Sequence, residues 1–265
     1  MNNKQLNKIR NWFDGFAAGF YGDDDYVNAN LKLKEDHSRR VCNEMLYLAD
    51  ELHLAERKRL LAETIGLLHD VGRYPQFVKY QTYHDPRSIN HCELAVQVLE
   101  EHKVLDTLDP AEKQIILKAV EYHGVKELPK NLDDETLFFC RLIRDADKLD
   151  ILCVMIENYQ RHRENPSKFS YEVELPDEPR YSPDIIRAVL NGEHIDYANL
   201  QTWNDMKLIN LAWVYDVNFI PTLKRIRERK SLETIVGLLP DTEDIRKVRD
   251  KVISYVDNRI GRRPV

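Results

Sequence analysis

Several histidines and aspartates of this sequence are spaced so that they fall on the apolar faces of different predicted helices. The histidines are His37, His69, His91 and His123, four of the nine in the chain. Asp70 directly follows His69, and Asp147 lies on the apolar face of a later helix. A lone histidine in such a place is usually a hydrogen-bonded core residue, but a buried carboxylate is costly unless it is paired or binds a metal ion. The pattern therefore predicts imidazoles and carboxylates from several helices around a divalent transition metal.

The elements that must position these side chains are predicted to be helices. Glycine is scarce, at nine residues, and long stretches contain neither Gly nor Pro, which disfavours an all-β chain. Apolar spacings of three and four predict helices at about 3–21, 36–53, 55–70, 133–159, 182–191, 205–229 and 241–260. Two more are expected to begin at Ser88 and at Asp109-Pro110. We therefore predict an all-α fold.

Two segments interrupt this helical pattern. Residues 73–87 are predicted as a polar, aromatic loop, RYPQFVKYQTYHDPR. Residues 165–183 are rich in proline and contain one candidate strand, FSYEVEL, which we interpret as half of a small β-hairpin insertion. We expect a single helical domain over 1–265, in which residues 182–265 form a C-terminal helical extension.

Composition excludes several classes of protein. The chain has 265 residues, 43% hydrophobic and 32% charged, which is enough for a substantial core. A net charge of −6 argues against general nucleic-acid binding. No run approaches the roughly 18 apolar residues of a membrane span, and the first residues lack the apolar stretch of a secretory signal. The cysteines Cys42, Cys92, Cys140 and Cys153 form no CxxC pair, so we expect reduced core thiols in a cytoplasmic protein.

The order of these residues resembles a known family. His37, then His69-Asp70 in LLHDVGR, then Asp147 in IRDADKLD, is similar to the H…HD…D signature of the HD superfamily of metal-dependent phosphohydrolases. The resemblance covers roughly residues 36–155 and implies an HD-domain helical bundle with extra helices at both ends. A second HD pair, His84-Asp85, precedes a proline in the polar loop, and we do not assign it to metal.

The resemblance also implies how the metal would be held. The residues implied for a first divalent ion are His37, His69, Asp70 and Asp147. His91 and His123 match a longer pattern found in members with two ions, in which the HD aspartate bridges them. Alternatively, one or both of these histidines contact the substrate or protonate the leaving group. One or two ions are therefore expected, and Mn, Fe, Mg, Co, Ni and Zn remain open.

Cationic and aromatic side chains near these positions are candidates for binding phosphate. The candidate substrate contacts are Arg73, Lys148, Tyr83, His84 and Arg87, and of these Arg73 and Lys148 are also candidate catalytic residues. Solvated surface charge is the alternative interpretation of the cations, and anchoring of the loop is the alternative for the aromatic residues. Asp150 is predicted either to orient a metal-binding histidine or to form an ordinary helix salt bridge.

By this resemblance, we expect a phosphatase, nucleotidase or phosphodiesterase that uses metal-activated water. Its substrate would be a phosphoester or phosphoanhydride of a small molecule, and we favour a nucleotide. Two alternatives stay open. An HD-fold di-iron oxygenase would need redox-active iron and O₂, and a non-catalytic regulator would bind a nucleotide without turnover. The sequence does not indicate an oligomeric state.

Overall fold

The chain forms α-helices and a few 3₁₀ helices in the computed structural model, which describes residues 1–165 and 175–262. No strand occurs within these described residues, and the predicted all-α class is confirmed. The candidate strand FSYEVEL, at 169–175, lies outside the described residues except for Leu175. The chain divides into two compact units, Met1–Asp150 and Ile151–Val265. The interpretation of 1–265 as one domain stays a prediction.

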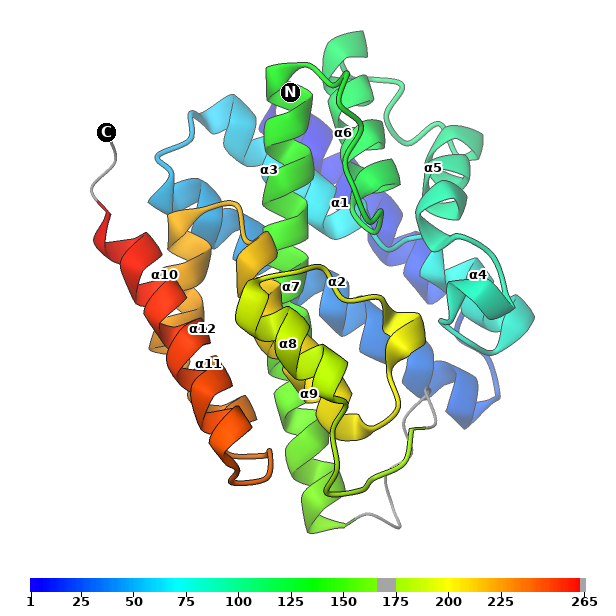
Figure 1. The fold of residues 1–265 in the computed structure, drawn as a ribbon. Coiled ribbons are helices and arrows are strands. Elements are labelled where there is room, and N and C mark those ends of the chain that lie inside the picture. The colour runs from blue at the N-terminus through cyan, green and yellow to red at the C-terminus, as the bar shows by residue number, and fades with distance from the viewer. Residues whose placement is uncertain (166–174, 263–265) are drawn as a thin grey trace. The chain divides into compact units, whose positions relative to one another are not determined.

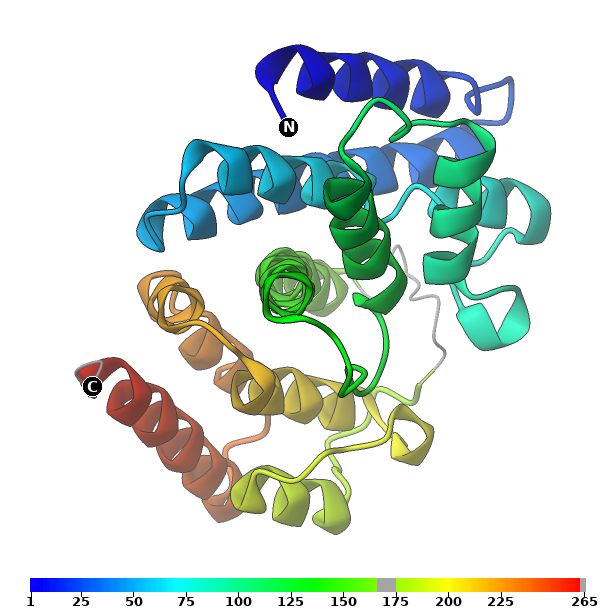
Figure 2. The ribbon, with the colours of Figure 1, turned by 90° about the horizontal axis from the view of Figure 1, so that it is seen from above.

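The first unit contains every residue predicted to bind metal. Its elements are α1 (Asn3–Ala18), α2 (Asp25–Glu51), α3 (Glu56–Leu68), α4 (Arg73–Tyr80), the 3₁₀ helix η1 (Asp85–Arg87), α5 (His91–Glu101), α6 (Pro110–Tyr122) and the first part of α7 (Asp134–Glu164) (Figure 1). Helices α2 and α3 pack along each other, α1 and α6 pack on α3, and α4 contacts α2 and α5. Figure 2 shows α1 on the outer side of the α2–α3 pair.

Helix α3 carries the HD pair into the core. Leu61, Ile65 and Leu68 on this helix are completely buried. Burying each of these side chains contributes about 1.5–3 kcal/mol relative to exposure. Because α3 ends at Leu68, the next two residues, His69 and Asp70, lie at the buried end of the helix. The apolar stripe therefore places the HD pair inside the protein.

Residues 73–80 form helix α4, so the prediction of a loop over 73–87 was wrong for its first half. Pro75 is the third residue of α4, and proline is tolerated in a first turn, where its missing N–H has no helical partner. Tyr74 is fully buried, and its ring lies 5.7–6.2 Å from the rings of Phe13, Phe16 and Phe20. The aromatic residues at the start of this segment thus anchor it to α1.

Capping residues explain where the other helices begin. Asp109 accepts a hydrogen bond from the Ala111 N–H, and Pro110 starts α6, as predicted. The start expected at Ser88 was wrong, because Asn90 caps α5. The Ser88 hydroxyl instead donates to the His84 carbonyl and accepts from the Gln76 amide. This shift makes His91 the first residue of α5.

The second unit is also helical. After the end of α7 it contains α8 (Pro183–Asn191), η3 (Tyr197–Asn199), α9 (Trp203–Ala212), η4 (Trp213–Asp216), α10 (Ile220–Glu228), α11 (Ser231–Val236) and α12 (Glu243–Gly261). The single helix predicted at 205–229 was wrong, since α9 and α10 are separate, with Pro221 in the first turn of α10. Helix α12 packs against α8, α10 and α11. Within the described part of the chain, no helix has both the length and the apolar character needed to span a bilayer.

Candidate metal centre

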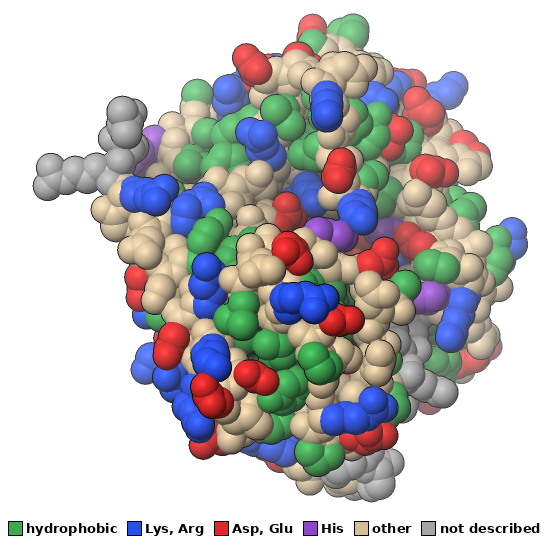
Figure 3. Space-filling model, viewed as in Figure 1, with side chains coloured by type: hydrophobic (Ala, Val, Ile, Leu, Met, Phe, Trp, Pro, Cys, Tyr) green, Lys and Arg blue, Asp and Glu red, His purple; other side chains and the backbone are tan. Residues whose placement is uncertain are grey.

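Four imidazole rings from four helices converge inside the first unit. They belong to His37 in α2, His69 directly after α3, His91 at the start of α5 and His123 directly after α6. All four are buried. The Nε2 atoms of His37 and His69 lie 3.3 Å apart, and those of His91 and His123 lie 3.1 Å apart. In the space-filling view of Figure 3, some histidine side chains are visible at the surface, with acidic and basic side chains nearby.

Two of the rings are oriented by carboxylates. The His37 Nδ1–H donates to Asp150 Oδ2 over 2.7 Å, and the His91 Nδ1–H donates to Asp85 Oδ2 over 2.6 Å. A carboxylate that accepts this hydrogen bond fixes the tautomer and makes the other ring nitrogen a better ligand. Both histidines therefore turn Nε2 toward the common centre.

The other two rings are oriented by backbone carbonyls at helix ends. The His69 Nδ1–H donates to the Gly66 carbonyl over 2.9 Å, and the His123 Nδ1–H donates to the Val120 carbonyl over 2.7 Å. These carbonyls belong to the last turns of α3 and α6, where helical N–H partners run out. The same local arrangement, a histidine directly after a helix, is thus used twice.

The donor set fits a cation. Because all four Nδ1 atoms face acceptors and carry the hydrogens, the neutral rings have lone pairs on Nε2. Each close Nε2···Nε2 contact then needs a positive charge, a proton or a metal ion, between two lone pairs. Imidazole nitrogens and carboxylates are ligands of divalent transition metals. In metal sites, the second ring nitrogen of a histidine ligand usually donates a hydrogen bond that orients the ring, as the Nδ1 atoms do here.

Asp70 lies between the two histidine pairs. Its Oδ2 is 3.5 Å from His37 Nε2 and 3.8 Å from His69 Nε2. Its Oδ1 is 3.6 Å from His91 Nε2 and 3.7 Å from His123 Nε2. One oxygen thus faces each pair, which is the arrangement of a carboxylate that can bridge two cations.

Two cationic side chains border the Asp70 carboxylate. Burial alone would raise the pKa of Asp70, but Lys34, His69 and the other nearby positive groups hold it well below its usual range. Lys34 Nζ is 3.0 Å from Oδ2, and Arg73 Nε is 3.5 Å from Oδ1. Lys34 was not singled out in the sequence, although it precedes His37 by three residues and therefore shares its helix face.

Asp147 completes the first histidine pair. Its Oδ1 is 3.2 Å from His37 Nε2 and 3.9 Å from His69 Nε2. This oxygen is buried and accepts no well-formed hydrogen bond among the described residues. Burial favours the neutral acid, yet His37 and His69 keep the pKa of Asp147 far below its usual range. A buried, ionised oxygen without a donor fits a metal ligand.

The imidazoles differ in how readily they take up protons. Burial lowers the pKa of His69 to about 4, so this ring is neutral at physiological pH. Burial also opposes protonation of His37 and His123. Their aspartate neighbours, together with Cys92 beside His123, outweigh it and raise the pKa of both rings. Without a metal, one ring of each pair therefore attracts a proton, which a binding cation must displace.

The two carboxylates that orient histidines were not equally predictable from the sequence. Asp150, predicted either to orient a histidine or to form a salt bridge, does both, because Arg40 Nε is 2.6 Å from its Oδ1. Asp85, which we read only as part of a polar turn, holds His91. Its other oxygen accepts from Arg73 Nη1 over 2.9 Å and from Gln76 Nε2 over 2.8 Å.

Replacing Asp85 with asparagine is expected to weaken the binding of a metal ion at the His91–His123 pair by about 10–100-fold. An asparagine that turns its oxygen toward His91 presents its NH₂ group to the Arg73 guanidinium, so His91 loses its orientation. Isothermal titration of metal-free protein with Co²⁺ measures the effect. Asp106→Asn is the control, because Asp106 is exposed and pairs only with Lys113 among the contacts seen. Equal affinities in both variants would contradict the role of Asp85.

Of the predicted substrate contacts, Arg73 and Tyr83 already have partners within the protein. Arg73 Nη1 donates to Gln76 Oε1 and to the Tyr83 carbonyl, and the Tyr83 hydroxyl donates to the Asn30 carbonyl. His84 is half-buried, and its Nδ1 has no hydrogen-bond partner in the structure as described. Lys148, next to Asp147, is half-buried, and Arg87 is exposed. Their contact with substrate stays a prediction.

Comparison with known proteins places this centre in a family. The family model for the HD domain matches residues 35–152, the stretch that contains all six converging histidines and aspartates. The predicted resemblance to the HD superfamily is confirmed over this stretch. HD domains form a superfamily of metal-dependent phosphohydrolases. No curated protein and no solved structure matches the chain.

Proposed function

We propose that this HD protein hydrolyses a phosphoester or phosphoanhydride of a small phosphorylated molecule, a nucleotide in our reading, with metal-activated water. The observation that supports it most is the set of four buried Nε2 lone pairs around the Asp70 carboxylate. His37, His69, Asp70 and Asp147 would hold one ion. Asp70, His91 and His123 would hold the other. Bound divalent ions lower the pKa of water and neutralise charge on phosphoryl oxygens.

The chain's own residues would do the rest. His91 and His123 carry hydrogens on Nδ1 and turn Nε2 toward the centre, which favours them as ligands once a cation displaces the proton that His123 attracts. Lys34 Nζ lies 3.0 Å from Asp70 and supplies a point charge beside the site. Arg73 holds Asp85 and the Tyr83 backbone in place, and in doing so supports His91. A cytoplasmic location belongs to the same proposal.

The experiment begins with full-length protein stripped of metal by a chelator. Manganese, cobalt, nickel, magnesium or zinc is then added without oxygen, and phosphate release is measured over nucleotides, bisphosphates and cyclic dinucleotides. We expect turnover only after metal is restored. A cation at 100 times its Kd should also stabilise the fold by about 2.7 kcal/mol, seen as a higher Tm.

Two outcomes would overturn the proposal in favour of the alternatives. Oxygen consumption that depends on iron, with no anaerobic phosphate release, would show an oxygenase. Tight nucleotide binding by metal-loaded protein, without phosphate release under any metal, would show a regulator. Neither alternative has an observation in the structure that favours it over hydrolysis.

A further inference from the structure

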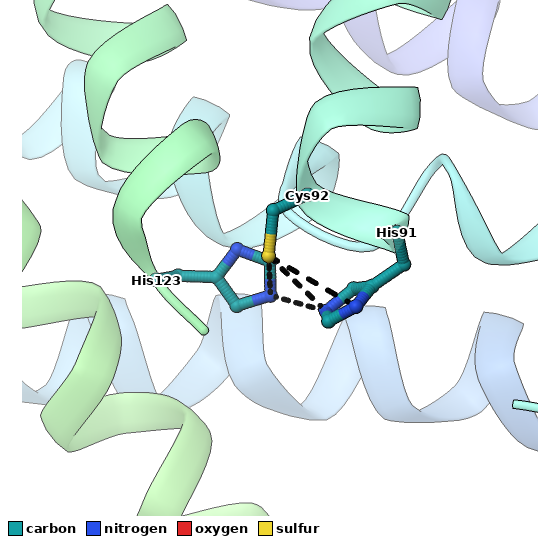
Figure 4. A group of neighbouring side chains, drawn as sticks. All are labelled: His91, Cys92 and His123. Atoms are coloured by element: carbon teal, nitrogen blue, oxygen red, sulfur yellow. Dashed lines mark hydrogen bonds between the residues drawn. The ribbon is translucent and has the colours of Figure 1, made fainter. Parts of the chain in front are cut away.

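The thiol of Cys92 lies against the second histidine pair. Its Sγ is 3.4 Å from His91 Nε2 and 3.8 Å from His123 Nε2. Figure 4 shows the sulfur facing both ring nitrogens of His91, with Nδ1 at 4.0 Å, and lying close to Nε2 of His123; His91 and Cys92 are at the start of α5 and His123 is on a separate segment. In the absence of a CxxC pair, the sequence predicts Cys92 to be a reduced core thiol.

The other buried cysteines behave differently. Cys42 Sγ lies 3.5 Å from the Glu63 carbonyl, and Cys140 Sγ lies 3.7 Å from the Lys118 carbonyl. Each is placed to donate its hydrogen to an oxygen, and burial raises the pKa of both thiols to about 12. Cys92 instead faces the two ring nitrogens whose lone pairs point to the centre. Its surroundings therefore differ from those of Cys42 and Cys140.

The distances match one face of a tetrahedral site. With metal–nitrogen bonds of about 2.0–2.1 Å and a metal–sulfur bond of about 2.3 Å, tetrahedral ligand atoms are separated by about 3.3 Å (N–N) and about 3.6 Å (N–S). Here the separations are 3.1 Å between the two Nε2 atoms and 3.4 and 3.8 Å from these atoms to Sγ. Asp70 Oδ1 lies 3.6 and 3.7 Å from the same nitrogens.

The two halves of the centre are then built alike. Each has one histidine oriented by a carboxylate, one oriented by a carbonyl at a helix end, and one oxygen of Asp70. Asp147 Oδ1 lies 3.2 and 3.9 Å from the Nε2 atoms of the first pair, and Cys92 Sγ lies 3.4 and 3.8 Å from those of the second pair. Thiolate is a softer ligand than carboxylate and favours zinc, cobalt or iron over magnesium and manganese.

Gly124 provides room for this thiol. A Cβ atom added at Gly124 would lie 2.9 Å from Cys92 Sγ and 3.3 Å from His91 Cε1. Cβ atoms in proteins essentially never come within 3.0 Å of a non-bonded heavy atom. Any side chain at position 124 would therefore displace the Cys92 sulfur or the His91 ring. The residue after His123 therefore has to be small for Cys92 to reach its position.

We propose that Cys92 is a thiolate ligand of the second metal ion, which makes the centre asymmetric, with a hard carboxylate-rich half and a softer half that contains sulfur. This inference rests on the proposed metal-dependent function. When the metal–sulfur bond forms, the Sγ–H proton is released to solvent, so the net charge of the site rises by one unit instead of two as the divalent ion enters. The second half should then select zinc, cobalt or iron.

Cobalt absorption tests the inference without using activity. Metal-free, full-length protein is titrated with Co²⁺, and thiolate-to-cobalt charge transfer is followed in the near ultraviolet. We expect the band in the wild type and in Cys140→Ser, the matched buried-thiol control, and its loss in Cys92→Ser and Cys92→Ala. We also expect Co²⁺ affinity in the second half to fall about 10–100-fold or more in both Cys92 variants. Gly124→Ala should weaken the band.

The outcomes separate this inference from the proposed function. Two bound cobalt ions without a charge-transfer band in the wild type would overturn thiolate ligation, and so would a band that persists in a folded Cys92→Ala protein. Metal-dependent phosphate release would uphold the proposed function in either case. If no divalent cation binds at all, both proposals are wrong. Circular dichroism of each variant shows whether the helices are intact.

Discussion

Asp70→Ala is expected to abolish binding at both halves of the metal centre and to lower kcat/KM by at least about 1000-fold, the equivalent of about 4 kcal/mol of lost transition-state stabilisation. The reason is geometric. Asp70 has one oxygen facing each histidine pair, Oδ2 toward His37 and Oδ1 toward His91. Its loss therefore removes a candidate ligand from both halves at once.

Asp70→Asn makes this test sharper because it keeps the shape of the side chain and removes its charge. Both variants should keep their helices, since Lys34 is part-exposed and can turn to water when its partner is lost. Asp36→Asn is the control, because Asp36 adjoins His37 in sequence but pairs with Lys32 at the surface. Metal stoichiometry, circular dichroism and phosphate release are measured together. Near-normal turnover in Asp70→Asn would contradict the proposed metal site.

The converging residues were predictable because each lies at a defined point of a helix pattern. His37 follows the apolar stripe of α2, and His69-Asp70 follows the last buried residue of α3. Asp147 lies on the buried face of α7. The 3.6-residue repeat of apolar residues shows which face of a helix is buried. Histidines and aspartates on that face are therefore easy to recognise. The family signature then states which of them belong together.

The supporting residues were harder to predict because their contacts depend on how loops fold back. Asp85 reaches His91 only because η1 turns the chain toward the start of α5, and Arg73 and Gln76 hold it there. No periodicity describes such a turn. The prediction of a loop over 73–87 also hid α4, since Pro75 looked like a helix breaker although it occupies a first turn.

Cys92 shows a further limit of pattern reading. Neighbouring residues on a helix point about 100° apart, so the residue after a ligand is expected to face elsewhere. His91 is the first residue of α5, and its hydrogen bond to Asp85 orients the ring toward the other three histidines. Cys92 can therefore lie beside the same ring. The assignment of the helix start to Ser88 concealed this, because it placed His91 inside a regular turn.

Gly72→Ala is expected to lower the free energy of unfolding by about 3 kcal/mol or more. This is at the upper end of the range seen when a group is added to a well-packed site. A Cβ atom at Gly72 would lie 2.3 Å from the His91 carbonyl oxygen and 2.6 Å from the Ala95 nitrogen. Both are backbone atoms of α5 and cannot rotate away. The backbone of Gly72 is right-handed helical, at φ −64° and ψ −21°, so the whole cost is steric.

The same contact sets the spacing of the metal centre. Gly72 follows Asp70 by two residues and touches α5 next to His91, so the added methyl group has to push α5 away from Asp70. We expect Gly72→Ala to lower the Tm by about 6–12 °C and to weaken binding at the His91–His123 pair more than at the His37–His69 pair. Gly15→Ala is the matched control. Its Cβ would meet nothing within 4 Å, and alanine should stabilise α1 by up to about 1 kcal/mol. If Gly72→Ala melts like the wild type and binds Co²⁺ equally well at both pairs, close packing of this turn on α5 does not position His91.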